Sequence, residues 1–310
     1  MKRVLLSIVA TCSLLNAGGY KVPEQSADSL GLAASNVAFS FGADAAYFNP
    51  ANMMFLDGLH HFESTLGWFH INSIDFKSDG GKSYSSEKFD SLAGTFSFVT
   101  PEIYENWRFG LALAVPAAVG ISWEDPETAF TGKRFKLQVV ELNPTVAYRI
   151  NDKLAIALGA RGVYSKGKIA SDFGRFGYRE IQGDGINYGY NVALTYRPIE
   201  ELSFAVTYRS KVNLELKGSA DADFNGQLAP ISYHGKTRVE IPLPAQLVLA
   251  TGYKFSDFTL LLAFERTYWS KFKDYDFEYD DKTAAHSHPV LGGYFKAFMD
   301  DPVVKNAKDT

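Results

Sequence analysis

Long segments in which apolar side chains alternate with small or polar ones limit this chain to few folds. In residues 186–197 every second residue is apolar or aromatic, and the residues between them are small or polar. The same period of two governs residues 154–169 and, with an interruption at Ser210, residues 202–217. Side chains of a β-strand point alternately to opposite faces, so each segment has one apolar face and one small or polar face. The pattern predicts long amphipathic strands and an all-β fold.

The length of these segments separates two kinds of all-β protein. Strands in soluble domains usually have about five or six residues, and a soluble sandwich buries its apolar faces against each other. Much longer amphipathic strands with Tyr and Trp near their ends suit a barrel that contacts lipid, and aromatic residues make up 15% of this chain. We therefore expect a transmembrane antiparallel β-barrel, and a secreted soluble β-protein is the alternative.

The alternation also assigns side chains to the two faces of this barrel. The residues expected to contact lipid are Tyr188, Val192, Leu194, Val206 and Leu214. The residues expected to face the lumen are Asn191, Thr195, Thr207 and Lys211. Small and charged side chains in the second set indicate a polar or plugged lumen.

The connections between the segments agree with an outer-membrane barrel. The predicted strands are 59–72, 89–100, 107–119, 135–150, 154–169, 186–197, 202–217, 236–254 and 258–273. Tight turns alternate with long polar loops, as in barrels whose turns lie in the periplasm and whose loops lie outside the cell. A bacterial single-chain barrel has an even number of strands, and the tail reaches Thr310 without a terminal aromatic strand. We therefore expect a chain truncated at its C-terminus.

The N-terminal region differs from the rest of the chain. A short basic leader, an apolar run and small residues up to Gly19 predict a secretory signal in residues 1–17, which contains the single cysteine, Cys12. Residues 18–58 do not alternate and are rich in Ala, Gly, Ser and Asn. They are too apolar for a disordered tail, so we expect a compact hatch inside the lumen, with a periplasmic extension as the alternative. Residues 59–310 would form the incomplete barrel.

Composition excludes several functions. A net charge of −4 gives no basic surplus for nucleic acid, and no apolar run reaches the about 20 residues of a spanning helix. With cysteine confined to the predicted signal and few histidines, we expect no metal and no cofactor. An outer-membrane lipase or protease would need a nucleophile and a base. Only His286 and His288, which flank Ser287, suggest one, so we expect no enzyme. A general porin would need an open lumen, and the apolar segment 18–58 argues against one, whereas a structural or adhesin barrel is compatible with the composition.

A series of short motifs occurs in a fixed order along the chain. They are Gly18-Gly19-Tyr20, Ser29-Leu30-Gly31-Leu32-Ala33, Tyr47-Phe48-Asn49-Pro50-Ala51, Ala147-Tyr148-Arg149-Ile150, Leu194-Thr195-Tyr196-Arg197, Thr207-Tyr208-Arg209-Ser210-Lys211-Val212, Leu243-Pro244-Ala245 and Tyr268-Trp269-Ser270-Lys271-Phe272. With these motifs the sequence resembles the FadL family of outer-membrane transporters for long-chain fatty acids and other hydrophobic compounds. The resemblance implies a fourteen-stranded barrel, of which about nine strands lie here, with an N-terminal hatch and lateral exit through a kinked third strand. It also implies a Gram-negative outer-membrane location, and we expect a monomer surrounded by lipid and lipopolysaccharide.

The third predicted strand contains a candidate break in the wall. Pro116 cannot donate a ladder hydrogen bond, and the small side chains of Ala117 and Ala118 leave space before Gly120. We predict that the wall opens at 116–120 and faces the hatch motif at Asn49, Pro50 and Ala51. A strand that ends at Val115 is the alternative.

The ligand residues follow from the resemblance. It implies that Tyr20 and Ile169 line an apolar pocket for the alkyl chain of a long-chain fatty acid. The family pairs the carboxylate with basic residues, but Ser171 occupies one matching position. Lys168 or Arg175 could replace that basic residue, and both could equally be solvated loop charges. An alkane or a monoaromatic hydrocarbon is therefore the alternative substrate.

Overall fold

The main element of the computed structural model, which describes residues 19–78, 80–225, 230–271, 276–280 and 309, is a 12-stranded sheet. Its strands are β1 (His61–Ile71), β4 (Phe89–Val99), β5 (Trp107–Ser122), β6 (Arg134–Asn151), β7 (Leu154–Asp172), β8 (Gly177–Ile199), β9 (Leu202–Arg209), β10 (Val212–Asn225), β11 (Pro230–Leu243), β12 (Gln246–Lys254), β13 (Thr259–Thr267) and β14 (Asp276–Tyr279). A separate short hairpin consists of β2 (Asp75–Lys77) and β3 (Ser83–Ser85). The helices are α2 (Ala27–Gly31), α3 (Ala45–Phe48) and α4 (Pro126–Gly132), with 3₁₀ turns η1 (Pro50–Phe55), η2 (Gly174–Phe176) and η3 (Trp269–Lys271).

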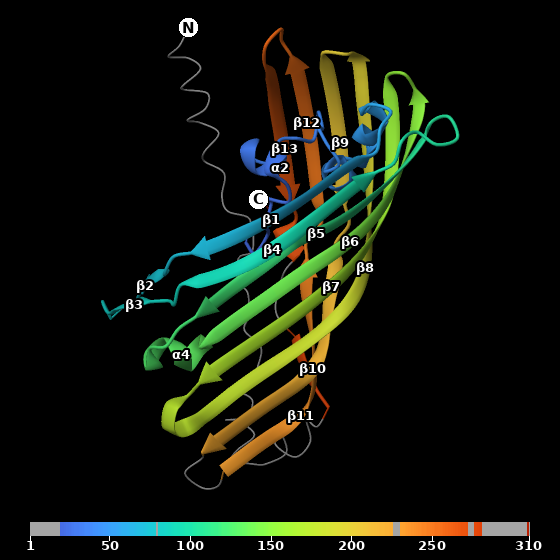
Figure 1. The fold of residues 1–310 in the computed structure, drawn as a ribbon. Helices are drawn as coiled ribbons and strands as arrows, with labels where there is room; N and C mark the ends of the chain where they lie inside the picture. Colours follow the sequence, from blue (N-terminus) through green and yellow to red (C-terminus); the bar gives the residue numbers. More distant parts are fainter. Residues whose placement is uncertain (1–18, 79, 226–229, 272–275, 281–308, 310) are drawn as a thin grey trace.

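All pairings in the large sheet are antiparallel, and the sheet divides at β8 (Figure 1). One end of β8 pairs with β9, and β12 and β13 follow. The other end pairs with β10, and β11 and β14 follow. Among the described residues, β1 is paired with β4 alone, so the sheet does not close on itself there. No helix of that part is long and apolar enough to cross a membrane.

Burial agrees with the predicted faces at seven of the nine residues that were assigned to a face. On the outer face Tyr188 is 79% exposed, whereas Asn191 and Thr195 are buried on the inner face. Val192, Leu194 and Val206 are likewise exposed, and Thr207 is buried. The assignments of Leu214 and Lys211 are wrong, because Leu214 is 0% exposed on the inner face and Lys211 is exposed.

A break in the ladder at Ser210 explains both exceptions. Ser210 donates its N–H to the carbonyl of Tyr190 at 2.9 Å, and its hydroxyl accepts the Tyr190 N–H at 2.9 Å. The predicted strand 202–217 is therefore divided into β9 and β10, and the register moves by one residue. Such a shift transfers every later side chain to the other face. Leu214 consequently points inward together with Val212 and Leu216.

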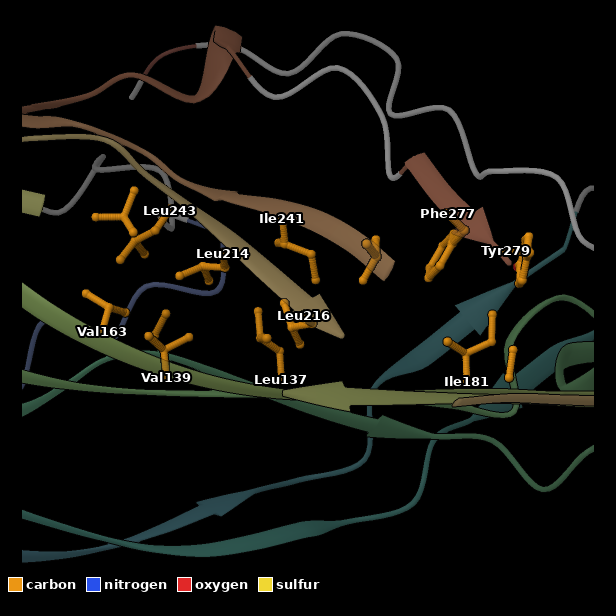
Figure 2. Close-up of a cluster of buried hydrophobic side chains, with 14 of the residues drawn as sticks. Leu137, Val139, Val163, Ile181, Leu214, Leu216, Ile241, Leu243, Phe277 and Tyr279 are labelled. Carbon is orange, nitrogen blue, oxygen red and sulfur yellow. The ribbon is translucent and has the colours of Figure 1, made fainter. Parts of the chain in front are cut away.

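Among the described residues, the inner face of the sheet carries three clusters of buried apolar side chains, two of which are large. One, the hatch core, packs α3 and η1 against small side chains such as Ala112, Ala147 and Ala193. The other is an apolar chamber in which side chains of β6–β8 face those of β10, β11 and β14 (Figure 2). Its labelled members are Leu137, Val139, Val163, Ile181, Leu214, Leu216, Ile241, Leu243, Phe277 and Tyr279. Small residues are required in the hatch core, because a Cβ at Gly110 would lie 2.5 Å from the Met53 sulfur.

Candidate functional site

Two of the predicted ligand residues meet at the apolar chamber. Tyr20 and Ile169 both pack against its buried side chains. The Tyr20 ring lies edge-on to Trp269 with centroids 5.0 Å apart, and its hydroxyl donates to the Pro242 carbonyl. The cavity beside Ile169 has a volume of only about 20 Å³, so side chains nearly fill it. A ligand would have to displace these side chains to enter.

The two predicted basic residues occupy different positions. Lys168 is on the rim of the same cavity, where its ammonium pairs with Glu180 at 2.8 Å. Arg175 lies in the exposed turn η2 with its guanidinium 4.9 Å from the centre of the Phe176 ring. The structure therefore brings Lys168 to the cavity beside Ile169, whereas Arg175 does not line that cavity.

Arg179 is a basic residue that sequence reasoning missed. It lies directly opposite Ser171 in the β7–β8 ladder, and its Nη2 donates to the Ser171 hydroxyl at 3.2 Å. The alternation predicts a loop over residues 170–185, whereas β7 continues to Asp172 and β8 begins at Gly177. Counting the strand register back from the turn would have paired these two residues.

The ladders of β5 are irregular near the predicted break. β4 pairs with β5 only from Phe96 to Val99, and the register between β5 and β6 shifts between Ala114 and Ala117. β5 itself continues to Ser122, so the alternative of a strand ending at Val115 is wrong. We call the unpaired space between residues 89–95 of β4 and residues 114–120 of β5 the wall gap. The ring of Phe89 covers one end of it, because a Cβ at Gly120 would lie 2.4 Å from that ring.

The N-terminal segment fills the wall gap with hydrogen bonds. The side-chain amide of Gln25 donates to the Val115 carbonyl at 2.9 Å and accepts the Val115 N–H at 2.7 Å. Its backbone carbonyl accepts from the Thr95 hydroxyl at 2.7 Å, which connects the gap to β4. Further along, Ala118 N–H donates to the Tyr20 carbonyl and Val22 N–H to the Pro116 carbonyl, both at 3.0 Å. We call residues 20–25 the seal.

The Asn49-Pro50-Ala51 motif has a different position from the one expected. Asn49 is fully buried, and its amide donates to the Val37 carbonyl at 2.7 Å and to the Thr195 hydroxyl of β8 at 2.8 Å. Its Oδ1 accepts the Ala51 N–H at 3.2 Å, so Asn49 caps η1, with Pro50 at the first position of that turn. The segment hydrogen-bonded at residues 116–118 is therefore the seal, whereas this motif anchors the hatch to β8.

A buried ionic network joins the hatch to the wall. The Glu141 carboxylate, 0% exposed, accepts from Arg161 at 2.7 and 3.0 Å and also from Arg209. Arg209 donates to the Tyr47 carbonyl at 2.8 Å, and its guanidinium lies 4.1 Å from the centre of the Tyr47 ring. Along β6, Glu141 lies between Val139 of the chamber and Ala147 of the hatch core. Sequence reasoning did not single out this network. Its signal in the sequence is a charged residue on a strand face that otherwise carries small side chains.

Curated relatives resemble the chain over most of its length. The long-chain fatty acid transport protein of Escherichia coli (strain K12) is 25% identical over an alignment of 310 positions, gaps included. This alignment covers 83% of this chain and 68% of the relative. Outer membrane protein P1 of Haemophilus influenzae is 22% identical, covering 91% of this chain and 73% of the relative.

Solved structures share the fold. A Pseudomonas aeruginosa FadL homologue superposes with a TM-score of 0.68 at 17% identity, covering 85% of this chain and 72% of that one. The Ralstonia pickettii toluene transporter TbuX gives a TM-score of 0.67 at 20% identity, covering 81% and 74%. These similarities confirm the predicted antiparallel transmembrane β-barrel.

A family model covers most of the chain. The model described as outer membrane protein transport protein (OMPP1/FadL/TodX) matches residues 7–291. The match includes the seal, the wall gap, the chamber and the ionic network, and it confirms the resemblance and the outer-membrane location expected from the motifs. The chain therefore belongs to the OMPP1/FadL/TodX family of outer membrane transport proteins.

Proposed function

We propose that this protein takes up long-chain fatty acids through the apolar chamber and releases them sideways through the wall gap. The observation that carries the proposal is the position of Tyr20. Its side chain packs against the chamber, and its backbone carbonyl occupies the wall gap by accepting from Ala118. A ligand that enters the chamber must therefore push on the same residue that closes the exit.

The seal explains how a broken ladder is compatible with a membrane. An unsatisfied backbone group in hydrocarbon costs several kcal/mol, so irregular backbone is tolerated only where protein shields it or where it lines a cavity. The seal supplies partners to Val115, Pro116 and Ala118. The exit is closed in this arrangement, and displacement of residues 20–25 opens it.

The hatch would prevent leakage through the periplasmic half of the lumen. Residues 18–58 are proposed to act as this plug, supported by Asn49, Tyr47 and their partners on the wall. The predicted signal, residues 1–17, lies outside the described residues, as do His286 and His288. The route needs no catalytic step, so we propose a transporter without enzyme activity; a monomeric state and contact with lipopolysaccharide stay predictions.

A monoaromatic or alkane substrate is the second candidate. The buried side chains of the chamber are apolar or aromatic, which suits a hydrocarbon without a head group. A fatty-acid carboxylate would instead pair with Lys136 or Lys168, which line the rim of the chamber cavity. Among relatives and structural neighbours, one is described as a fatty acid transporter and another as a toluene transporter.

Uptake measurements separate the two substrates. A strain that lacks its own transporters of this family and expresses the gene for this protein is given labelled oleate or labelled toluene. We expect saturable oleate uptake that exceeds uptake by the strain carrying an empty vector. Saturable uptake of toluene alone would assign the second substrate, and uptake of neither compound would contradict the proposed function.

A further inference from the structure

Four basic side chains surround the end of the hatch at the side of the sheet that carries the tight turns. They are Arg108 of β5, Arg149 of β6, Arg197 of β8 and Lys254 of β12. The turns on this side connect β6 to β7, β8 to β9 and β12 to β13. Since short turns lie in the periplasm in barrels of this class, these cations surround the periplasmic mouth.

Two of the four cations hold the hatch in place. Arg108 donates from Nη2 to the carbonyls of Leu56, at 3.2 Å, and Asp57. Arg149 donates to the Met54 carbonyl and pairs with Glu102 at 3.0 Å. Carbonyls at the end of a helical turn lack partners within it, so the role of these two arginines is accounted for.

Arg197 and Lys254 have no such role. The Arg197 guanidinium lies between two aromatic rings, 4.8 Å from the centre of Phe39 and 4.2 Å from that of Phe55. Its Nε is buried and makes no hydrogen bond with any described residue. The Lys254 ammonium lies 4.6 Å from the same Phe39 ring. Two like charges thus share one ring, and within the described part of the chain no carboxylate lies within ion-pair distance of either.

A cavity opens beside these two cations. Its volume is about 530 Å³, within the about 300–1,000 Å³ that is usual for ligand pockets. It is lined by Met54, Phe55, Leu56, Arg149, Asp152, Lys153, Arg197, Pro198, Ile199, Glu200 and Lys254. Four of these side chains are cationic and two are acidic, and the remainder are apolar. The lining therefore combines a positive charge with a surface that suits an alkyl chain.

We propose that this periplasmic cavity binds the carboxylate of an amphiphile, with Arg197 and Lys254 holding the carboxylate oxygens. A planar guanidinium with an unused N–H suits a carboxylate, and hydrogen bonds between charged groups are stronger than neutral ones. Phe55, Leu56 and Ile199 offer apolar contacts to the alkyl chain. The site lies below the hatch and is separate from the chamber and the wall gap, so its occupancy does not depend on the uptake route proposed above.

A probe inside the cavity tests this site without measuring uptake. An environment-sensitive dye is attached to Asp152→Cys, an exposed lining position with no role in the proposed binding, in a Cys12→Ser background. The purified protein in neutral detergent is titrated with octanoate, octanol and inorganic phosphate. We expect saturable octanoate binding at least tenfold tighter than binding of octanol or phosphate. Arg197→Gln and Lys254→Gln should each raise the octanoate Kd at least tenfold. The matched control Lys211→Gln, an exposed lysine outside the cavity, should leave it unchanged.

The remaining outcomes contradict the proposal. Equal affinity for octanoate and octanol would show that the cavity recognises the alkyl chain and not the carboxylate. Phosphate binding as tight as octanoate binding would indicate a general anion site. An unchanged octanoate Kd in both Arg197→Gln and Lys254→Gln would show that these two residues do not hold the carboxylate. Because Lys254 is exposed, Lys254→Gln tests the site even if Arg197→Gln fails to fold. Failure of oleate uptake with intact octanoate binding would contradict the proposed function alone.

Discussion

A side-chain amide can stand in for a missing neighbouring strand, and Gln25 does so beside Val115. One amide carries both a donor and an acceptor, so it satisfies the N–H and the C=O of the same residue. The bonds span a part of β5 where pairing with β4 has ended. Gln25 is therefore the residue through which the seal closes the wall gap.

Replacing Gln25 with Leu should open the wall gap. The side chain keeps its approximate volume, but Val115 loses both partners, and each unsatisfied buried group costs about 1–3 kcal/mol. We expect faster oleate uptake together with a lower urea midpoint of unfolding in lipid vesicles. Gln138→Leu, at an exposed position of β6, is the matched control and should change neither quantity. Slower uptake in Gln25→Leu would show that this residue does not close the exit.

Asp44 makes the stability of the hatch depend on pH. Burial raises the pKa of its carboxyl to about 6, and Asp28 adds to the rise, whereas hydrogen bonds from Ser26 and Asn36 oppose it. A carboxyl whose pKa is higher in the folded state binds more protons there, so it favours folding at low pH. This contribution, about 3 kcal/mol from the size of the shift, is lost as pH rises from about 4 to about 6.

The corresponding variant is Asp44→Asn, which cannot ionise. We expect the free energy of unfolding of the wild type, measured relative to this variant, to fall between pH 4 and pH 7. Urea unfolding at both values gives this difference, which includes the coupling of Asp44 to the nearby Glu63 carboxylate. A difference that is the same at both pH values would contradict the burial of an ionisable Asp44.

At the scale of the elements, long strands were predictable and their interruptions were less so. Alternation located the long strands of the sheet, because half-buried strands must have a period of two, but it joined β11 and β12 into one strand over 236–254. It marked an interruption at Ser210 but not the change of face beyond it, since apolar residues keep to even positions on either side and only the partner Tyr190 shows that the register has moved. The break at Pro116 was predictable because proline removes a donor within one residue. Gln25 was not, because its partners lie 90 residues away along the chain.

The wall gap in β5 should be sensitive to side-chain volume. Ala118→Trp places a large ring where the seal and β5 meet, and we expect it to abolish oleate uptake. Barrel assembly, followed by the heat-dependent shift of mobility on gels, should remain normal. Ala160→Trp, at an exposed position of β7, is the matched control and should transport normally. Unimpaired uptake by Ala118→Trp would leave the lateral exit without support.

An arginine substitution should have different effects on the outer face and on the inner face of the sheet. Leu194 is 40% exposed on the outer face, so Leu194→Arg should cost about 2–4 kcal/mol if the residue lies near the bilayer midplane. At Thr195, on the inner face beside Asn49 and Asn52, Arg would instead break the contacts of the hatch. We expect Leu194→Arg to lower the urea midpoint without leakage, and Thr195→Arg to admit small polar antibiotics. Leakage in the first variant only would reverse the assignment of faces.

At the scale of the whole molecule, the hatch and the wall form one structure. Arg209 links Tyr47 of the hatch to Glu141 of the wall, and Arg161 balances the same carboxylate. Removing one member of a buried charged group is costly because it leaves the remaining charge uncompensated. The position of the hatch is therefore set by strands that are far from it in the sequence.

Arg209→Gln should loosen the hatch without unfolding the sheet. We expect faster amide hydrogen exchange in residues 45–55 and a loss of about 1–3 kcal/mol of stability, because Glu141 keeps Arg161 but the Tyr47 carbonyl loses its donor. The double variant Glu141→Gln with Arg209→Gln should be less stable than Arg209→Gln alone, because it leaves the buried Arg161 without a carboxylate partner. Unchanged exchange in residues 45–55 would show that the network does not hold the hatch.

The seal belongs to the same chain as the wall that it closes, and this has a kinetic consequence. Because it is tethered, it rebinds at an effective concentration that is fixed by the chain and is of millimolar order for a short connection. Reclosure is therefore a first-order event, independent of how many copies of the protein the membrane holds. A ligand competes with residues 20–25 as with a permanently attached inhibitor, and a free peptide of the same sequence would need millimolar amounts to match it. Each molecule therefore recloses its own exit after a ligand has passed.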